Sequence, residues 1–508
     1  MRDMVKQVSE NLLMAVPQKS RHNIDSQTLT TSGFGTLTPV YIQEAVPGGQ
    51  YTLSAETLVR FQPLASPLMH KCTTKIFYFY VPYRILWHNW EHFVMGKPDP
   101  LTGLDPVFPY YPASYYSSTP LVNGVNQNRL ADYLGIKVPP TGSSQNLNPM
   151  AFAAYQKIYN RYFRHKALKT ESFSPDTLND GLLSPTNFVL MSTLQKITYE
   201  DDYFNQALPT PQKGDPIFID DNSIVRVNDD SANSWKIKTL LAGGNYDMTL
   251  PDNPPGTGVR SNVPALELYA DVKIAMEELR VANAMQKFVE AERHTHTYKD
   301  YHKMMFNSNI KDDRVQDAEY ITGHTQPITI SDVVNTADLQ GRLTSTGDSY
   351  FRADGDTYYT PEHGLIMGIA VTTYSSAYMK ALPKVHLKTD RFEYFHPAFD
   401  NLGEQKIIQA EINGLQAGDT GTFGYVPKHH EYRKSWDMIT GEMATTYAHW
   451  HLARNYAGGT GLTSTFHEVL DERRIFVYTD DDYDAILYQV YNNVSALLPM
   501  GDMSVPTL

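Results

Sequence analysis

Histidines are the side chains in this sequence whose type best suits metal chemistry. His294, His296 and His302 lie in ERHTHTYKDYH at 292–302, and His449 and His451 lie in AHWHLAR. Metal sites need ligands on one face of an element, and a spacing of two residues does not give that on a helix. We therefore expect solvated or interface histidines at both segments, and no metal site.

Acidic side chains provide two further candidates. The run TDDDYD at 479–484 has the carboxylates that a hard cation prefers, although a solvated strand end is the simpler interpretation. Glu91 lies beside Trp87 and Trp90. Carboxylates near aromatic rings suit glycoside hydrolysis, in which two acidic residues flank the sugar bond. In a chain with 56 acidic residues such neighbours also arise by coincidence.

Motifs of the common enzyme classes do not occur in the sequence. GGTGLTST at 458–465 lacks the lysine of a phosphate-binding loop, and HEVLD at 467–471 ends in the wrong residue for a zinc protease. There is no G-x-S-x-G nucleophile elbow. We expect no enzymatic activity, no catalytic residue and no cofactor.

A basic segment at 155–169 is the main candidate for nucleic-acid binding. A helix is predicted over 148–168, and it would place Lys157, Arg161 and Arg164 on one face, with Lys166 close by. Cations beside aromatic rings suit single-stranded nucleic acid, because phosphates meet the charge while bases stack. The alternative is an amphipathic helix whose basic face is solvated and whose aromatic residues are in the core: Phe152, Tyr155, Tyr159 and Tyr162.

Aromatic residues are concentrated in KIFYFYVPYRILWHNWEHFVMG at 75–96. The near-continuous apolar run at 73–81 predicts a strand covered on both faces, which Pro82 ends. The spacing of Leu86, Trp90 and Phe93 then predicts one side of a short helix. Large aromatic residues also stabilise subunit contacts, so we expect core or interface positions for Phe77, Phe79, Trp87, Trp90 and Phe93.

Composition indicates a soluble protein with much buried surface. The 508 residues include only 19% charged but 12% aromatic residues, and the net charge is −13. An acidic balance argues against a surface wrapped throughout by nucleic acid. The single Cys72 excludes an internal disulfide, and no apolar run is long enough for a bilayer span. We expect a protein of a reducing compartment without a secretory signal.

Strand candidates lie far apart in the sequence, as in a sandwich with Greek-key connections. They are 37–44, 51–58, 73–81, 364–376, 473–479 and 485–492. A second helix is predicted over 265–294, where Gly and Pro are absent. Residues 210–262 are acidic and then rich in Gly and Pro, which predicts an insertion in the core fold.

The run SRHNIDSQTLTTSGFGTLTPVYIQEAVPGGQYTLSAETLVRFQPLASPLM at 20–69 resembles the opening of microvirus major capsid proteins, most closely those of the gokushovirus-like branch. Further matching segments follow in order, and the aromatic segment 75–96 is the first. The others are YNRYFRHKAL, DDYFNQALPTPQKG, ELRVANAMQKF, EYITGHTQPITI, EHGLIMGIAV, HPAFDNLGEQ, FGYVPKHHEYRKSWDMITGEM and WHLAR. The likeness covers 20–455. Thr210 departs from the tryptophan of many relatives, and 210–262 does not align.

The resemblance implies one eight-stranded antiparallel jelly roll over 1–508, mainly β, with long loops, several helices and a large surface insertion. It implies an N-terminal arm at 1–36, and a protrusion at 210–262 that contacts the host. Sixty copies would form a T=1 icosahedral shell around circular single-stranded DNA. The implied partners are an internal scaffolding protein, a DNA pilot protein and a host receptor.

A capsid protein is therefore expected, located in the virion and assembled in the host cytoplasm. Lys157, Arg161, Arg164 and Lys166 would face DNA, and the arm supplies further cations. The outer surface would carry the acidic residues of the insertion: Asp220, Asp221, Asp229 and Asp230. Two other hypotheses remain, a glycan-binding or glycan-cleaving β-sandwich and a dedicated single-stranded-DNA-binding protein.

Overall fold

The structure is a computed structural model. It describes residues 19–117, 129–137, 145–174, 178–211, 225–228, 234–237, 268–270, 276–292, 304, 316–334, 343–400, 403–415, 420–456, 461–480 and 483–501. The chain divides into two compact units, one formed by Met1–Pro211 with Lys311–Leu508 and the other by Gln212–Ile310. The second unit begins close to the expected start of the insertion and runs beyond its expected end at 262.

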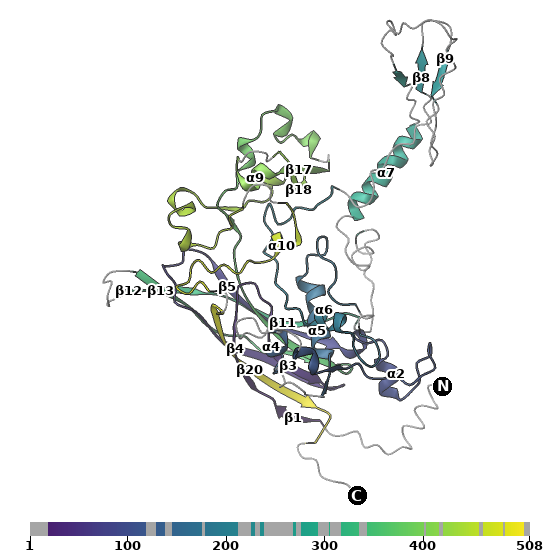
Figure 1. Ribbon diagram of the computed structural model, residues 1–508, viewed down its shortest axis with the longest axis vertical. Coiled ribbons are helices and arrows are strands. Elements are labelled where there is room, and N and C mark those ends of the chain that lie inside the picture. Colours follow the sequence, from purple (N-terminus) through teal and green to yellow (C-terminus); the bar gives the residue numbers. More distant parts are fainter. Residues whose placement is uncertain are drawn as a thin grey trace. The chain divides into compact units, whose positions relative to one another are not determined.

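A seven-stranded antiparallel sheet forms one layer of the first unit (Figure 1). Its order is β1-β20-β4-β13-β12, and β14 also pairs with β4 and β2 with β20. Buried and more exposed residues alternate along β4 and β20, so one face of this sheet is covered and the other is open. The strands are β1 Ser20–Asn23, β2 Ser26–Ser32, β4 Gln50–Phe61, β12 Thr329–Val334, β13 Leu343–Arg352, β14 Asp356–Tyr359 and β20 Ile486–Leu498.

A four-stranded antiparallel sheet in the order β11-β5-β15-β3 forms the second layer. Its strands are β3 Thr38–Ala45, β5 Cys72–Pro82, β11 Glu319–Pro327 and β15 Gly364–Tyr374. Every residue of β15 is buried, as expected for a central strand that is covered on both sides. β-branched and aromatic residues favour such strands because they pack on a pleated surface.

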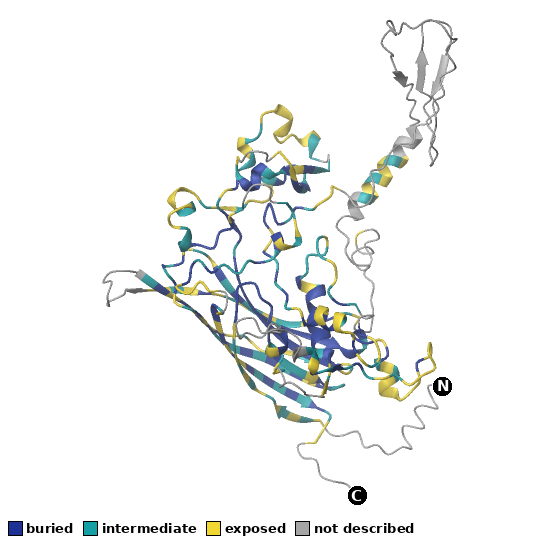
Figure 2. Ribbon diagram, in the orientation of Figure 1, coloured by how far each residue is buried: buried dark blue, intermediate teal, exposed yellow. Residues whose placement is uncertain are grey.

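The two sheets pack face to face and share one hydrophobic core (Figure 2). The Tyr78 hydroxyl of β5 donates to Asn492 Oδ1 of β20 over 2.5 Å, which ties the layers together inside the core. A hydroxyl pair between Thr372 of β15 and Tyr488 of β20 makes a second link. Buried polar groups need such partners, so these bonds also fix how the layers align.

Helices cover the outer face of the smaller sheet. α5 (Met150–Ile158) continues into a π-helical turn, η2 (Tyr159–Phe163), and contacts β5 and β15. The Tyr155 hydroxyl of α5 donates to the Leu37 carbonyl, just before β3. Further helices of this unit are α2 Trp90–Met95, α3 Ser114–Ser117, α4 Arg129–Tyr133, α6 Pro185–Ser192 and α10 Ser464–His467.

A smaller lobe with its own core is built mainly from residues after β15, together with residues 203–207. Its strands β17 (Glu404–Ile408) and β18 (Thr422–Pro427) pair, and α9 (Gln409–Asn413) joins them. Phe204, Tyr378, Ile407 and Val426 belong to this second core. Short pairs and 3-10 turns complete the fold: β6 Tyr111–Pro112, β7 Asn146–Leu147, β16 Ala377–Tyr378, β19 Asp437–Met438, η1 Tyr83–Ile85, η4 Lys384–His386, η5 Arg391–Glu393, η6 Pro397–Phe399, η7 His430–Tyr432, η8 Gly441–Ala444 and η9 Ala448–Trp450.

The described part of the second unit contains three strands and a helix. β8 (Val225–Asn228) pairs with β9 (Ser234–Ile237) and with β10 (Leu268–Ala270), and α7 spans Met276–Glu292. The helix predicted over 265–294 is therefore wrong in its first part, because residues 268–270 pair with β8 instead. Local sequence could not show this pairing, since the partner strand lies about forty residues away.

Three other predicted elements need correction. Residues 473–479 form no strand; Ile475 and Phe476 are buried there in an irregular segment. The helix over 148–168 ends at Phe163, and Arg164 is extended. The segment around Leu86 is not one helix either, because η1 stops at Ile85 and α2 begins only at Trp90.

Candidate assembly and nucleic-acid surfaces

The predicted basic face on α5 and η2 is largely paired with acidic side chains. Asp317 Oδ1 lies 3.7 Å from Lys157 Nζ, and Asp317 Oδ2 lies 3.1 Å from Arg161 Nε. Arg164 instead binds Glu171 Oε1 at 3.1 Å and donates to the Lys169 carbonyl. Lys166 is partly exposed and also has interactions of its own. Ion pairing reduces the charge these residues offer to phosphate, and their contact with DNA stays a prediction.

The π-helical turn explains why Arg164 does not share the face of Lys157 and Arg161. Arg164 N–H donates to the Tyr159 carbonyl over 3.0 Å, five residues back. Such a turn contains more residues than an α-helical turn, so the 3.6-residue spacing fails across it. Phe152, Tyr155 and Tyr159 are buried as the alternative predicted, but Tyr162 is 43% exposed.

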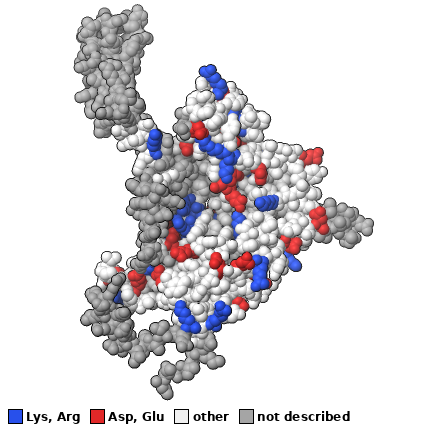
Figure 3. All heavy atoms as spheres, turned by 180° about the vertical axis from the view of Figure 1, so that it is seen from behind, with Lys and Arg blue, Asp and Glu red and all other residues white. Residues whose placement is uncertain are grey.

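Charges of both signs are mixed on the molecular surface. On the face drawn in Figure 3, Lys and Arg lie among Asp and Glu rather than in a patch of their own. A polarised charge distribution, as expected for a shell with an inner DNA face, is not visible on this face. The four acidic candidates of the insertion, Asp220, Asp221, Asp229 and Asp230, lie outside the described residues.

The aromatic strand β5 has both faces covered, which confirms the prediction for 73–81. Ile76, Tyr78 and Tyr80 are buried, and Tyr78 points into the core between the sheets. Phe77 and Phe79 contact the helices on the outer face of the smaller sheet. Their ring centroids lie 5.6 and 5.9 Å from that of Phe163 in η2. Phe79 is fully buried and Phe77 is half-buried, so both stabilise the packing of the helical layer.

Exposure to solvent increases from Trp87 through Trp90 to Phe93. Trp87 is 0% exposed, and its Nε1–H donates to Asp180 Oδ1 over 2.8 Å. Trp90 is half-buried, with its ring centroid 4.8 Å from that of Tyr83. Phe93 is 41% exposed. Trp87 is therefore a core residue, whereas Phe93 is available for contacts with another molecule.

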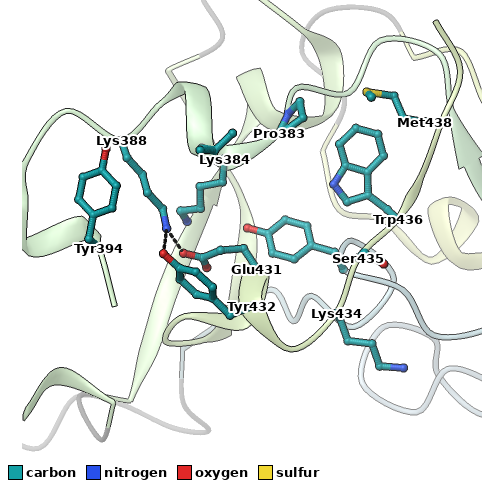
Figure 4. Close-up of a pocket in the computed structure, with 12 residues that line it drawn as sticks. Pro383, Lys384, Lys388, Tyr394, Glu431, Tyr432, Lys434, Ser435, Trp436 and Met438 are labelled. Carbon is teal, nitrogen blue, oxygen red and sulfur yellow. Dashed lines mark hydrogen bonds and ion pairs between the residues drawn. The ribbon is translucent and has the colours of Figure 1, made fainter. Parts of the chain in front are cut away.

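A groove in the smaller lobe is a candidate binding surface that the sequence did not predict (Figure 4). It has a volume of about 340 Å³. We define it by its lining residues, which come mainly from the turns around η4, η5 and η7: Tyr203, Pro383, Lys384, Val385, Lys388, Tyr394, Glu431, Tyr432, Lys434, Ser435, Trp436 and Met438. Most of this lining is aromatic or aliphatic, and much of it is open to solvent.

An ion pair organises one side of the groove. Lys388 Nζ lies 2.6 Å from Glu431 Oε1 and 3.2 Å from the Tyr432 hydroxyl, and the Lys388 side chain is only 4% exposed. Burial alone would raise the pKa of Glu431, but the hydrogen bonds from Lys388 and Gln405 outweigh it and lower that pKa. Burial would lower the pKa of Lys388, and its bonds to Glu431 and Tyr432 instead raise it.

A second ionisable cluster lies beneath the groove. Glu411 is buried, accepts a hydrogen bond from Tyr203 at 2.8 Å, and lies 3.7 Å from Lys384 Nζ. Burial raises the pKa of Glu411, and Lys384 and Tyr203 reduce this effect. Two of the three lysines of the groove therefore have acidic partners within the lobe. Lys434 has no ion-pair partner among the described residues, and it is exposed at the rim.

The sequence carried a weak signal for this groove. Most of its lining falls in KVHLKTDRFEYFHPAF and FGYVPKHHEYRKSWDM, where aromatic and basic residues are mixed without strand or helix spacing. Tyr394 and Tyr432 are each at least half exposed, while His429 and His430, just before Tyr432 in the sequence, are buried. The exposure of these tyrosines depends on the turns η5 and η7, and the hydrophobic periodicity of the sequence does not predict those turns.

The remaining chemical candidates have structural explanations or lie outside the described residues. His451 is buried, and its Nε2 lies 2.7 Å from the Met443 carbonyl oxygen. His294, His296 and His302 are not described. Within the described ranges, no three His, Cys, Asp or Glu side chains are placed to hold a metal ion. No helix in those ranges is long and apolar enough to cross a bilayer.

Comparisons with known proteins identify the family. A family model described as capsid protein (F protein) matches residues 13–508. Capsid protein VP1 of Bdellovibrio phage phiMH2K is 27% identical over 96% of this chain and 95% of its own length. Capsid protein VP1 of Chlamydia phage 1 is 25% identical over 94% of each chain, and that of Spiroplasma virus 4 is 24% identical over 96% and 95%.

These relatives are structural proteins rather than enzymes, in agreement with the expectation of no enzymatic activity. They come from gokushovirus-like microviruses, the branch whose capsid proteins the sequence resembles. This chain therefore belongs to the F-protein family of phage capsid proteins.

Proposed function

We propose that this capsid protein assembles, as sixty copies, into a T=1 icosahedral shell around a circular single-stranded DNA genome. The observation that supports this most is the set of large apolar side chains that the first unit leaves exposed. Leu101 is 87% exposed, Leu104 is 71% exposed and Val385 is 62% exposed. Exposed apolar surface marks interaction sites, and a shell protein needs several of them per copy.

An eight-stranded jelly roll is the fold that we infer at the centre of the first unit. Two antiparallel sheets packed face to face support it. Strands distant in sequence are neighbours, as in β4 with β20 and β5 with β15, which Greek-key connections require. Residues 1–36 would include the N-terminal arm, although residues 20–32 contribute strands β1 and β2 to the larger sheet.

DNA inside the shell would meet the cations of the inner surface. Lys157, Arg161, Arg164 and Lys166 stay our candidates, with Lys19 and Arg21 near the chain start. Because Asp317 neutralises part of the charge of Lys157 and Arg161, we infer weak contacts that do not depend on base sequence. Such contacts, repeated in every copy, would add up over the shell.

Other partners would act at distinct stages. An internal scaffolding protein would guide assembly in the host cytoplasm, and a DNA pilot protein would act at genome delivery. We infer that residues 210–262 form the surface protrusion that contacts a host receptor. The insertion at this position in the chain supports the inference, together with its acidic residues Asp220, Asp221, Asp229 and Asp230.

Digestion of the packaged nucleic acid tests the genome assignment. Particles purified from the natural source would be treated with nuclease, washed and then disrupted. The released nucleic acid should be degraded by a nuclease specific for single-stranded DNA and should resist an exonuclease that needs free ends. Released RNA, or DNA that only a double-strand-specific nuclease degrades, would contradict the proposal. Particle images with icosahedral symmetry would count the copies.

The glycan hypothesis loses part of the observation that motivated it. Trp87 is in the core and donates its indole N–H to Asp180, so it cannot stack on a sugar. Glu91 lies 3.6 Å from Arg84, measured between carboxylate oxygen and Nε. The segment that suggested a sugar platform is therefore mainly a packing element.

A further inference from the structure

A loop with exposed apolar side chains follows α2 in the first unit. α2 ends at Gly96, whose positive φ of 60° closes the helix, and residues 97–107 follow. We call residues 97–107 the knob loop. At its tip Leu101 and Leu104 are 87% and 71% exposed. Phe93, Val94 and Met95 of α2 and Val107 extend this exposed apolar surface.

Hydrogen bonds within the knob loop hold the two leucines outward. Asp99 Oδ1 accepts from the Leu101 N–H over 2.9 Å, and Asp99 Oδ2 accepts from the Thr102 hydroxyl over 2.9 Å. The Asp99 N–H donates to the Leu104 carbonyl, also over 2.9 Å, which closes the turn. Gly103 has φ of 68°, a conformation that favours glycine at this position. A preorganised loop loses little conformational entropy on binding.

Exposed leucines on such a loop indicate a protein partner. Side chains at loop tips are usually polar, because apolar groups gain by leaving water. Here the Asp99 carboxylate is buried and accepts hydrogen bonds from within the loop, and the leucines face solvent. This is the reverse of the usual arrangement, and it matches the apolar anchors found at the centre of interfaces.

The groove of the smaller lobe has the complementary character. Tyr394, Tyr432 and Trp436 provide aromatic walls, with Val385 and Met438 as exposed apolar residues beside them. The two surfaces also carry opposite charges. Lys434 at the rim of the groove and Asp105 in the knob loop are exposed, and neither has an ion-pair partner among the described residues. One surface thus offers apolar side chains with a carboxylate, and the other an apolar groove with an ammonium group.

The two surfaces lie at separate ends of the first unit, α2 at one and β17–β18 at the other (Figure 1). A chain therefore cannot fill its own groove with its own knob loop. A contact between two different patches of identical copies is heterologous, and repetition of such a contact generates rings. Closed shells consist of rings of this kind around their symmetry axes.

We propose that the knob loop of one copy inserts Leu101 and Leu104 into the groove of a second copy, with Asp105 facing Lys434. This contact rests on the proposed shell function, for which it supplies one specific subunit joint. The groove is therefore an acceptor for another copy of this chain rather than for DNA.

Cysteine cross-linking tests the contact in assembled particles. The variant Leu101→Cys with Met438→Cys should give covalently linked chains on mild oxidation, because the native Cys72 is buried and does not compete. Each single variant should remain monomeric on a non-reducing gel. Particles of the double variant that assemble but yield no linked chains would overturn the proposal. So would linkage of Leu101→Cys to itself, or of Met438→Cys to a scaffolding protein.

Charge reversal separates this contact from general damage. Asp105→Lys should raise the protein concentration needed for assembly at least tenfold, and so should Lys434→Asp, while circular dichroism of the subunits stays unchanged. Combining both substitutions should restore assembly to within about threefold of the original chain. Failure of the double variant to recover would overturn the proposal. If the unaltered chain forms no particles under any condition, the shell function itself fails, and the two failures are thereby distinguished.

Discussion

Replacing Trp87 by alanine tests the division of the aromatic segment into core and surface. Trp87 is 0% exposed, contacts Phe93 and Phe108, and donates to Asp180. Truncation of a fully buried tryptophan typically costs about 3–5 kcal/mol in the free energy of unfolding. The loss of the indole hydrogen bond adds little beyond this, because Asn89 continues to donate to Asp180 over 3.1 and 3.2 Å.

Phe93→Ala is the matched control within the same segment. Phe93 is 41% exposed, so its truncation should cost about 1 kcal/mol, well below the value for a buried aromatic residue. The assay is urea denaturation of unassembled subunits, followed by circular dichroism. Assembly should show a strong defect for Phe93→Ala even though its subunits stay folded. Equal destabilisation by both variants, or a loss below about 1 kcal/mol for Trp87→Ala, would refute this division.

Three further predictions concern charged groups. Burial, His165 and Arg454 lower the pKa of His467 from 6.5 to about 3, so the unfolded chain binds more protons in this range. His467 should therefore contribute a loss of stability of roughly 1.4 kcal/mol per pH unit as pH drops from 6.5 toward 3. Denaturation of His467→Phe at several pH values should show a slope that is smaller by this amount, and an unchanged slope would contradict the prediction. Glu431→Gln should lower stability by about 1–3 kcal/mol at pH 7, because the neutral amide no longer forms an ion pair with the buried Lys388 ammonium. The pKa of Glu431 is lowered in the folded state, so its contribution is present above the unfolded pKa near 4.5 and lost as pH falls further; a Glu431→Gln deficit that stays constant to pH 3 would contradict this cause. Lys157→Ala with Arg161→Ala should lower the temperature at which particles release DNA, by an amount that shrinks with added salt; no shift at low salt would remove both residues as DNA contacts.

The sequence was sufficient to locate the central strands. Continuous apolar and aromatic runs predicted β5 and β15, whose two faces are covered. The strand candidates 51–58 and 485–492 fall within or close to β4 and β20, along which buried and more exposed residues alternate. The same signal failed at 473–479, because an apolar run shows burial and not pairing. There the Phe476 N–H bonds to the Arg473 carbonyl in a local turn instead of a sheet.

The candidate surfaces were harder to predict than the core. Helical spacing placed Lys157 and Arg161 correctly near each other, but Asp317, which pairs with both, comes from a segment about 150 residues away. Periodicity within a segment carries no information about such a partner. The knob loop and the groove were missed for a related reason. Their apolar residues look like ordinary core residues in the sequence, and only the fold shows that they are exposed.

The mass and absorbance of particles from the natural source test the central claim most directly. The chain has a mass of 57.5 kDa, so a shell of many copies should appear as uniform megadalton particles. Their ratio of absorbance at 260 and 280 nm should show nucleic acid inside. A species near 57.5 kDa or a small multiple of it, free of nucleic acid, would contradict the assignment as a genome-enclosing shell protein.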